Sequence, residues 1–363
     1  MNLYSNLKQR GSLILACAGV LMSAVATPAL AERAELAADR VAYSWQASTP
    51  GATHVVRQEG ARWLRLRFDA IELPAGSVLR LTSLADGARQ HLNATTAAQW
   101  RNTSAYFNGA AVRVELLAAE GAAGARVALA EVVAGRAVDG TESQCGPSDD
   151  RVASNAANRA RLLDVGCTAN LTADGCFITA GHCMATASLL DVVEFNVPLS
   201  AANGGLVHPP PADQYVPTGT RQFSNGGIGN DWGVFTVFAN TETGLTPLQA
   251  QGSGLEFSTV LPRRRNTVEI TGYGVDTGSA NQTQQVSSGP VQSVSSSTNT
   301  LKYVSDTEGG NSGSAVVVGG RVVAIHTNGG CKTSGRGANS GTMIGNAGFQ
   351  AAYAAVCNAP VMR

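Results

Sequence analysis

The sequence has few charged residues and no excess of either sign. Only 14% of its 363 residues are Asp, Glu, Lys or Arg, and 26 basic side chains balance 26 acidic ones. A protein that binds nucleic acid neutralises phosphates with clustered Lys and Arg, so we expect no nucleic-acid partner. The 44% of apolar residues argue against a disordered chain, and the length suits about two domains.

No apolar run is long enough to cross a membrane as a helix, which takes ~20 residues. The most apolar stretch, residues 12–26, follows two basic residues and ends before the small-x-small sequence of residues 29–31. This order predicts a secretory signal over residues 1–31, which is removed during export. A retained anchor and lipid attachment at Cys17 are the alternatives. We therefore expect a secreted or periplasmic protein without a membrane span.

The sequence also lacks CxxC and HExxH motifs, two common spacings of metal ligands. Removal of the signal leaves six cysteines, all beyond residue 140. They are Cys145, Cys167, Cys176, Cys183, Cys331 and Cys357. An even number of cysteines in an exported chain indicates disulfides, so we expect neither a metal nor a cofactor.

The cysteine-free part, residues 32–135, is predicted to be an antiparallel β-sandwich. Short runs in it alternate apolar and polar side chains and are separated by turn sequences. These runs are residues 63–68, 77–84, 111–117 and 126–133. We see no nucleophile paired with a base, so this module is either a propeptide or an attached binding domain. The polar residues 136–165 are interpreted as a linker and the place of proteolytic processing, before a domain at 166–363.

Three segments of that domain carry His, Asp and Ser in this order. Residues 166–183, GCTANLTADGCFITAGHC, predict a hairpin that delivers His182 at its end and brings Cys167 and Cys183 together. Asp231 precedes the apolar run WGVFTVF, and Ser312 lies in GGNSGSA. A serine hydroxyl needs a base to become a good nucleophile, and the base needs an acid to orient it. The three residues are therefore candidates for a catalytic triad.

These segments resemble those of the chymotrypsin-like serine peptidases, in which TA(A/G)HC carries the base and G(D/N)SG the nucleophile. The resemblance covers residues 160–357 and implies a double β-barrel, with a helix expected at about 347–357. It also implies a disulfide between Cys167 and Cys183. The amides of Gly310 and Ser312 would form the oxyanion hole. The remaining four cysteines allow three pairings, which stay open.

The residue before the nucleophile departs from the animal enzymes of that family. They place Asp there, to pair with a newly cut N-terminal amine, whereas Asn311 carries no charge. The GNSGS form is instead similar to bacterial secreted peptidases, including glutamyl endopeptidases. Their pocket for an acidic side chain is lined by a Thr and a His at positions that match Thr307 and His326 here. A basic preference through Asp306, six residues before Ser312, is the alternative.

The sequence therefore predicts an all-β protein with an N-terminal β-sandwich, followed by a chymotrypsin-like double β-barrel and a C-terminal helix. We expect a monomeric secreted serine endopeptidase, made as a zymogen. It would cleave protein or peptide substrates, with a preference for an acidic residue before the scissile bond. The rivals are the same peptidase with a basic preference, and an inactive homologue that serves in binding or adhesion.

Overall fold

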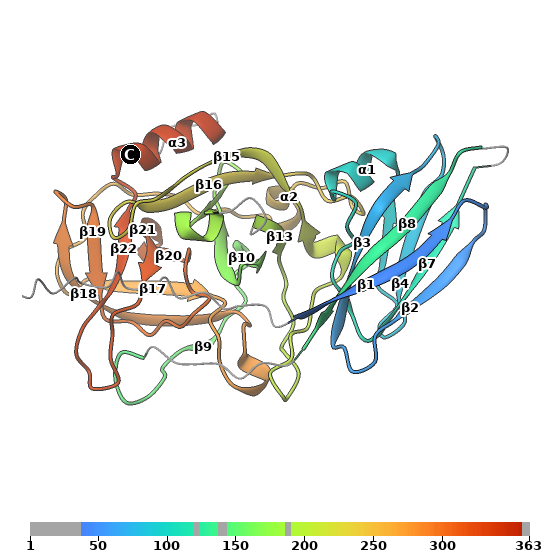
Figure 1. Ribbon diagram of the computed structural model, residues 1–363. Coiled ribbons are helices and arrows are strands. Elements are labelled where there is room, and N and C mark those ends of the chain that lie inside the picture. Colours follow the sequence, from blue (N-terminus) through green and yellow to red (C-terminus); the bar gives the residue numbers. More distant parts are fainter. Residues whose placement is uncertain (1–37, 120–122, 137–143, 186–189, 358–363) are drawn as a thin grey trace, which may run out of the picture.

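The computed structural model describes residues 38–119, 123–136, 144–185 and 190–357 (Figure 1). The predicted signal of residues 1–31 and residues 137–143 of the expected linker lie outside these ranges. Within the described ranges no helix has the length and apolar character that a membrane crossing requires.

The N-terminal module consists of two four-stranded antiparallel sheets that enclose one apolar core. Alternate side chains of β3 and β7, such as Leu64, Leu66, Val112 and Val114, are fully buried between the sheets. The first sheet has the order β1 (Ala38–Ala47), β8 (Arg126–Gly135), β3 (Trp63–Glu72), β6 (Phe107–Asn108). The second has the order β2 (Thr53–Arg57), β7 (Ala111–Leu117), β4 (Val78–Ser83), β5 (Arg89–Leu92), and α1 (Ala94–Gln99) follows β5.

Two seven-stranded sheets form the rest of the described chain. One has the order β14 (Gln214–Tyr215), β13 (Leu190–Glu194), β10 (Arg159–Asp164), β11 (Cys167–Leu171), β12 (Phe177–Thr179), β16 (Asp231–Val237), β15 (Pro217–Asn225). The other has the order β17 (Thr267–Gly272), β20 (Ala315–Val318), β21 (Arg321–Asn328), β22 (Asn339–Met343), β19 (Thr300–Tyr303), β18 (Gln285–Ser295), β9 (Val152–Ala153). This part of the chain also contains the short helix α2 (Pro247–Gln251) and the final helix α3 (Ala347–Cys357).

The second of these sheets closes on itself, because β17 also pairs with β18. The first remains an open barrel with β14 and β15 at its edges. The predicted all-β class and the chymotrypsin-like double barrel with a C-terminal helix are therefore confirmed.

The second half of the expected linker is not a linker in the structure, because it supplies a strand to each barrel. β9 pairs with β18, and β10 lies between β11 and β13. Its polar composition misleads because Arg161 is fully buried. The guanidinium donates to Glu194 at 2.7 and 2.9 Å, and this carboxylate compensates the buried charge.

The N-terminal module packs on the first barrel, which lies between it and the second barrel (Figure 1). Leu163 and Val192 of the barrel belong to the same apolar core as the module. The buried Arg65 of the module pairs with Asp191, and Tyr106 stacks on His208 with ring centroids 4.7 Å apart. The module therefore contacts the side of the first barrel that faces away from the second.

Three disulfides settle the pairings that the sequence left open. Cys167 is bonded to Cys183, as the resemblance implied. The other two disulfides are Cys145–Cys331 and Cys176–Cys357. Each of these joins residues more than 180 positions apart, so they tie the beginning of the domain to its end.

Candidate active site

His182 and Asp231 are hydrogen bonded to each other in the first barrel. His182 lies in a 3₁₀ helix, Gly181–Met184, that follows β12, and Asp231 is the first residue of β16. The Nδ1 atom of His182 is 2.6 Å from Oδ2 of Asp231. The backbone amide of His182 donates to Oδ1 of the same carboxylate at 2.9 Å. Both side chains are almost fully buried, so the carboxylate holds the imidazole in one orientation.

Local packing leaves His182 little freedom to move. Its neighbour Cys183 is bonded to Cys167 on β11. A Cβ atom on Gly181 would lie 1.8 Å from the carbonyl oxygen of Ser224, so only glycine allows this close approach to β15. The hairpin expected from the sequence is present, with Asn170 opposite Ile178.

Ser312 comes from the loop that precedes β20 of the second barrel. Its carbonyl oxygen accepts from the amide of Thr168 at 2.8 Å and lies 3.9 Å from Sγ of Cys183. The hydroxyl of Thr168 donates to the carbonyl of Gly310 at 2.8 Å. The structure therefore brings the loop of Ser312 against the hairpin that carries His182.

The amides of Gly310 and Ser312 have orientations set by the carbonyls of the same peptide groups. The carbonyl of Gly309 accepts from the amide of Val275 at 2.8 Å, and that of Asn311 accepts from Ser314 at 2.9 Å. In a trans peptide the N–H points opposite to the C=O, so both amides point away from these donors. Gly310 has φ 104°, a conformation that glycine adopts without strain.

Thr307 lies in the loop that leads to Ser312, and His326 lies on β21, where its backbone bonds Gly313 and Ser314. The Thr307 hydroxyl accepts from the side-chain amide of Asn339 at 2.8 Å. Nδ1 of His326 is 2.6 Å from the phenolic oxygen of Tyr303. Burial, and next the nearby charge of His182, lower the pKa of His326 to about 3. His326 is therefore a neutral imidazole near pH 7.

The carboxylate of Asp306 is bound by the backbone of residues 144–153. Its Oδ1 accepts from the amide of Cys145 at 2.6 Å, and its Oδ2 accepts from the amide of Asp150 at 2.8 Å. The residue is 4% exposed. Because both carboxylate oxygens already bind backbone amides, Asp306 serves to hold residues 144–153 in place.

The donor atoms of Cys167, His182 and Cys183 lie within 4.8 Å of one another. Both sulfurs belong to one disulfide, so neither is a thiolate that could bind a metal. This group is the only candidate metal cluster among the described residues.

Three residues around the site were missed by the reasoning from sequence. Tyr303 holds His326, and Asn339 bonds Thr307 and, through its Oδ1, the amides of Gly330 and Cys331. Arg151 was assigned to the linker. None of them lies in a motif, so no sequence signal identified them.

No family model and no curated protein sequence matches the chain. Among solved structures, one described as a Glu endopeptidase in complex with MPD is 22% identical, with a TM-score of 0.43. That match covers 56% of this chain and 95% of the other. A thermostable serine protease, AL20, from an extremophilic microorganism is 18% identical, with a TM-score of 0.37, covering 52% and 91%.

Proposed function

We propose that the chain is a serine endopeptidase in which Ser312, His182 and Asp231 form the triad. The observation that carries this proposal is the His182–Asp231 pair, held at 2.6 Å beside the loop of Ser312. The pair comes from the first barrel and the serine from the second, so the site lies where the two barrels meet.

The reaction would proceed through an acyl-enzyme. The Ser312 hydroxyl attacks the carbonyl carbon of the substrate and passes its proton to Nε2 of His182. Asp231 stabilises the imidazolium that forms, and the amides of Gly310 and Ser312 hold the oxyanion. Collapse of the tetrahedral species breaks the C–N bond, and the leaving amine takes the proton from His182. Water then repeats the steps and releases the acid product, without a cofactor.

The pocket would select an acidic side chain before the scissile bond. If Tyr303 donates to Nδ1 of His326, the imidazole carries its proton on Nε2 and can donate it to a carboxylate. The Thr307 hydroxyl, which accepts from Asn339, can donate its own hydrogen. Asp306, the basis of the rival basic preference, is engaged by two backbone amides.

We expect a peptide-library digest, read by mass spectrometry, to show cuts after Glu or Asp. His326→Leu should lower kcat/KM for a Glu substrate about 10- to 100-fold, because a hydrogen bond to a charged group is lost. The same variant should change kcat/KM for a matched Gln substrate much less. Cuts after Lys or Arg would contradict the pocket assignment.

Export to an oxidising compartment forms part of the proposal. The chain has three disulfides. Disulfides persist in oxidising compartments and are rare in the cytosol. The predicted signal of residues 1–31 would direct the export. Processing within residues 136–143 would convert a precursor into two fragments that stay packed together.

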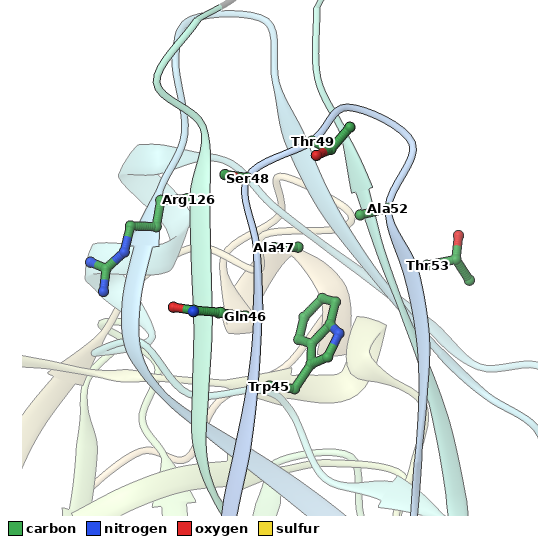
Figure 2. Close-up of a pocket in the computed structure, with 8 residues that line it drawn as sticks. All are labelled: Trp45, Gln46, Ala47, Ser48, Thr49, Ala52, Thr53 and Arg126. Carbon is green, nitrogen blue, oxygen red and sulfur yellow. The ribbon is translucent and has the colours of Figure 1, made fainter.

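One observation favours a second, binding role for the N-terminal module. A hollow of about 510 Å³ opens between β1 and β2, and the indole of Trp45 lies in this space (Figure 2). His54 stacks on the indole, with ring centroids 5.0 Å apart, and is hydrogen bonded to Tyr43 at 2.8 Å. An aromatic ring in a hollow that Ser48 and Thr49 also line suits the mixed apolar and polar surface of a sugar.

Binding and catalysis can be tested on the same full-length chain. With Ser312→Ala to prevent digestion, Trp45→Ala should weaken retention on a polysaccharide resin about tenfold. The control Phe223→Ala removes an exposed aromatic ring from the first barrel and should leave retention unchanged. Equal retention of both variants would remove the binding role. Absence of fluorophosphonate labelling at Ser312 of the wild type would identify an inactive homologue instead.

A further inference from the structure

We infer that Arg151 is a positioning residue, which holds the loop before Ser312 in its catalytic form without a newly cut N-terminus. The inference rests on the proposed peptidase function. It concerns residues 144–153, here called the strap, and the loop of residues 306–312. Arg151 would act on the oxyanion amides through Asn311 and would not touch the substrate.

The strap is fastened to the second barrel at several points. Cys145 is bonded to Cys331, and the amides of Cys145 and Asp150 both donate to Asp306. The carboxylate of Asp150 accepts from the hydroxyl of Ser287 at 2.9 Å. β9, at the end of the strap, pairs with β18. These contacts all lie beyond residue 143, so a cut within residues 137–143 leaves them intact.

Arg151 points from the strap to the loop and is 2% exposed at its side chain. Its Nε and Nη2 donate to Asp149, at 3.0 and 2.6 Å, and Nη2 lies 3.6 Å from Asp276. Its Nη1 is buried and makes no hydrogen bond with any described residue. A Cβ atom on Gly274 would lie 2.6 Å from Nη1 and 2.2 Å from Oδ1 of Asn311. The two atoms therefore approach each other across the space that this glycine leaves.

The charge of Arg151 is secured by its surroundings. Burial acts to lower its pKa, but the carboxylates of Asp149, Asp276 and Glu308 outweigh burial, and the pKa is raised. The guanidinium therefore stays a cation at every pH at which the protein is folded. It supplies a permanent positive charge next to a loop that has no Asp before the nucleophile.

Asn311 is the part of the loop on which this charge acts. Its Oδ1 accepts from the amide of Glu308 at 2.9 Å, and its own amide donates to the carbonyl of Glu308, also at 2.9 Å. A cation beside Oδ1 favours the orientation in which the oxygen, not the NH₂, faces the Glu308 amide. The turn that this pair closes contains Gly310 and leads directly to Ser312, so it sets the two oxyanion amides.

The test compares Arg151→Met with Arg151→Lys in the full chain. Loss of one well-placed oxyanion donor costs about 10²- to 10³-fold in kcat, so we expect Arg151→Met to lose about 100-fold in kcat with little change in KM. Affinity for a peptide boronic acid, which forms the tetrahedral adduct, should fall in parallel. Arg151→Lys, or millimolar guanidinium added to Arg151→Met, should restore part of kcat. Arg321→Met, which removes an exposed arginine, is the control.

Unchanged kcat in Arg151→Met would overturn the inference. It would also be overturned if KM rose by the same factor as kcat fell and neither Arg151→Lys nor guanidinium restored activity. Should Arg151→Met fail to fold, Gly274→Ala places a methyl group between Nη1 and Asn311 and should lower kcat similarly. Intact-mass analysis after fluorophosphonate labelling should find label on the uncleaved chain; label confined to cleaved chains would also overturn it. A wild type that takes no label in either form would instead refute the proposed peptidase function.

Discussion

Ser312→Ala should lower kcat by about 10⁵- to 10⁶-fold and leave the fold unchanged. The methyl side chain removes the nucleophile, and the rest of the site then retains only the residual effect of binding and oxyanion stabilisation. Steady-state hydrolysis of a peptide substrate measures the loss, and fluorophosphonate labelling should disappear with it. The carbonyl of residue 312 still accepts from Thr168, so the loop keeps its place.

The matched control for this variant is Ser314→Ala. It makes the same chemical change two residues further along, at a buried hydroxyl that has no hydrogen-bond partner in the described chain. We expect it to retain nearly full turnover. His182→Ala combined with Ser312→Ala should be no slower than Ser312→Ala alone, because the triad acts as a unit. Substantial turnover by Ser312→Ala would mean that the chemistry lies elsewhere.

Residues in compact motifs were placed well by the sequence, because their spacing is itself a structural constraint. The segment from Cys167 to Cys183 forms one hairpin closed by one disulfide, so its sequence alone is enough to predict the local structure around His182. Alternating runs such as residues 111–117 correspond to β7 without a shift, since one face of the strand packs in the core. In both cases local sequence and local structure carry the same information.

Long-range partners could not be predicted in this way. Residues 159–164, RARLLD, look polar, yet Arg161 is buried because Glu194, 33 residues later, compensates it. Arg151 and Asn311 lie on either side of Gly274, and Arg151 reaches this place because β9 joins the second barrel at β18. The contact of Arg65 with Asp191 likewise depends on how two domains pack. A buried charge looks like a surface charge until its partner is known.

Acid should destabilise the double-barrel domain through His326. Its pKa is lowered to about 3 in the folded chain, by burial first and then by the charge of His182, against about 6.5 when unfolded. Between these values the unfolded chain binds more protons, so stability is complete above pH 6.5 and falls as the pH drops. Well below pH 6.5 each pH unit costs about 1.4 kcal/mol, and the loss between pH 6.5 and 4.5 is about 2 kcal/mol.

Two other buried groups act in the same direction. Burial lowers the pKa of His208, although the Glu194 carboxylate opposes this, so its neutral form also favours the folded state above pH 6.5. Burial acts to raise the pKa of Glu194, but His208 and Arg161 outweigh it and lower the pKa. Its contribution to stability is therefore lost only below about pH 4.5, as the pH falls toward its folded pKa.

We therefore expect His326→Gln, in the Ser312→Ala background that prevents self-digestion, to reduce the acid sensitivity of unfolding. Between pH 6.5 and 4.5 its unfolding free energy should fall by about 2 kcal/mol less than that of the parent, measured by urea titration. Tyr303→Phe is the control, because it removes the hydroxyl bonded to Nδ1 and keeps His326 buried, so the steep pH dependence should remain. An unchanged fall in His326→Gln would show that the imidazole is already protonated in the folded chain, and a charged His326 would then face the substrate.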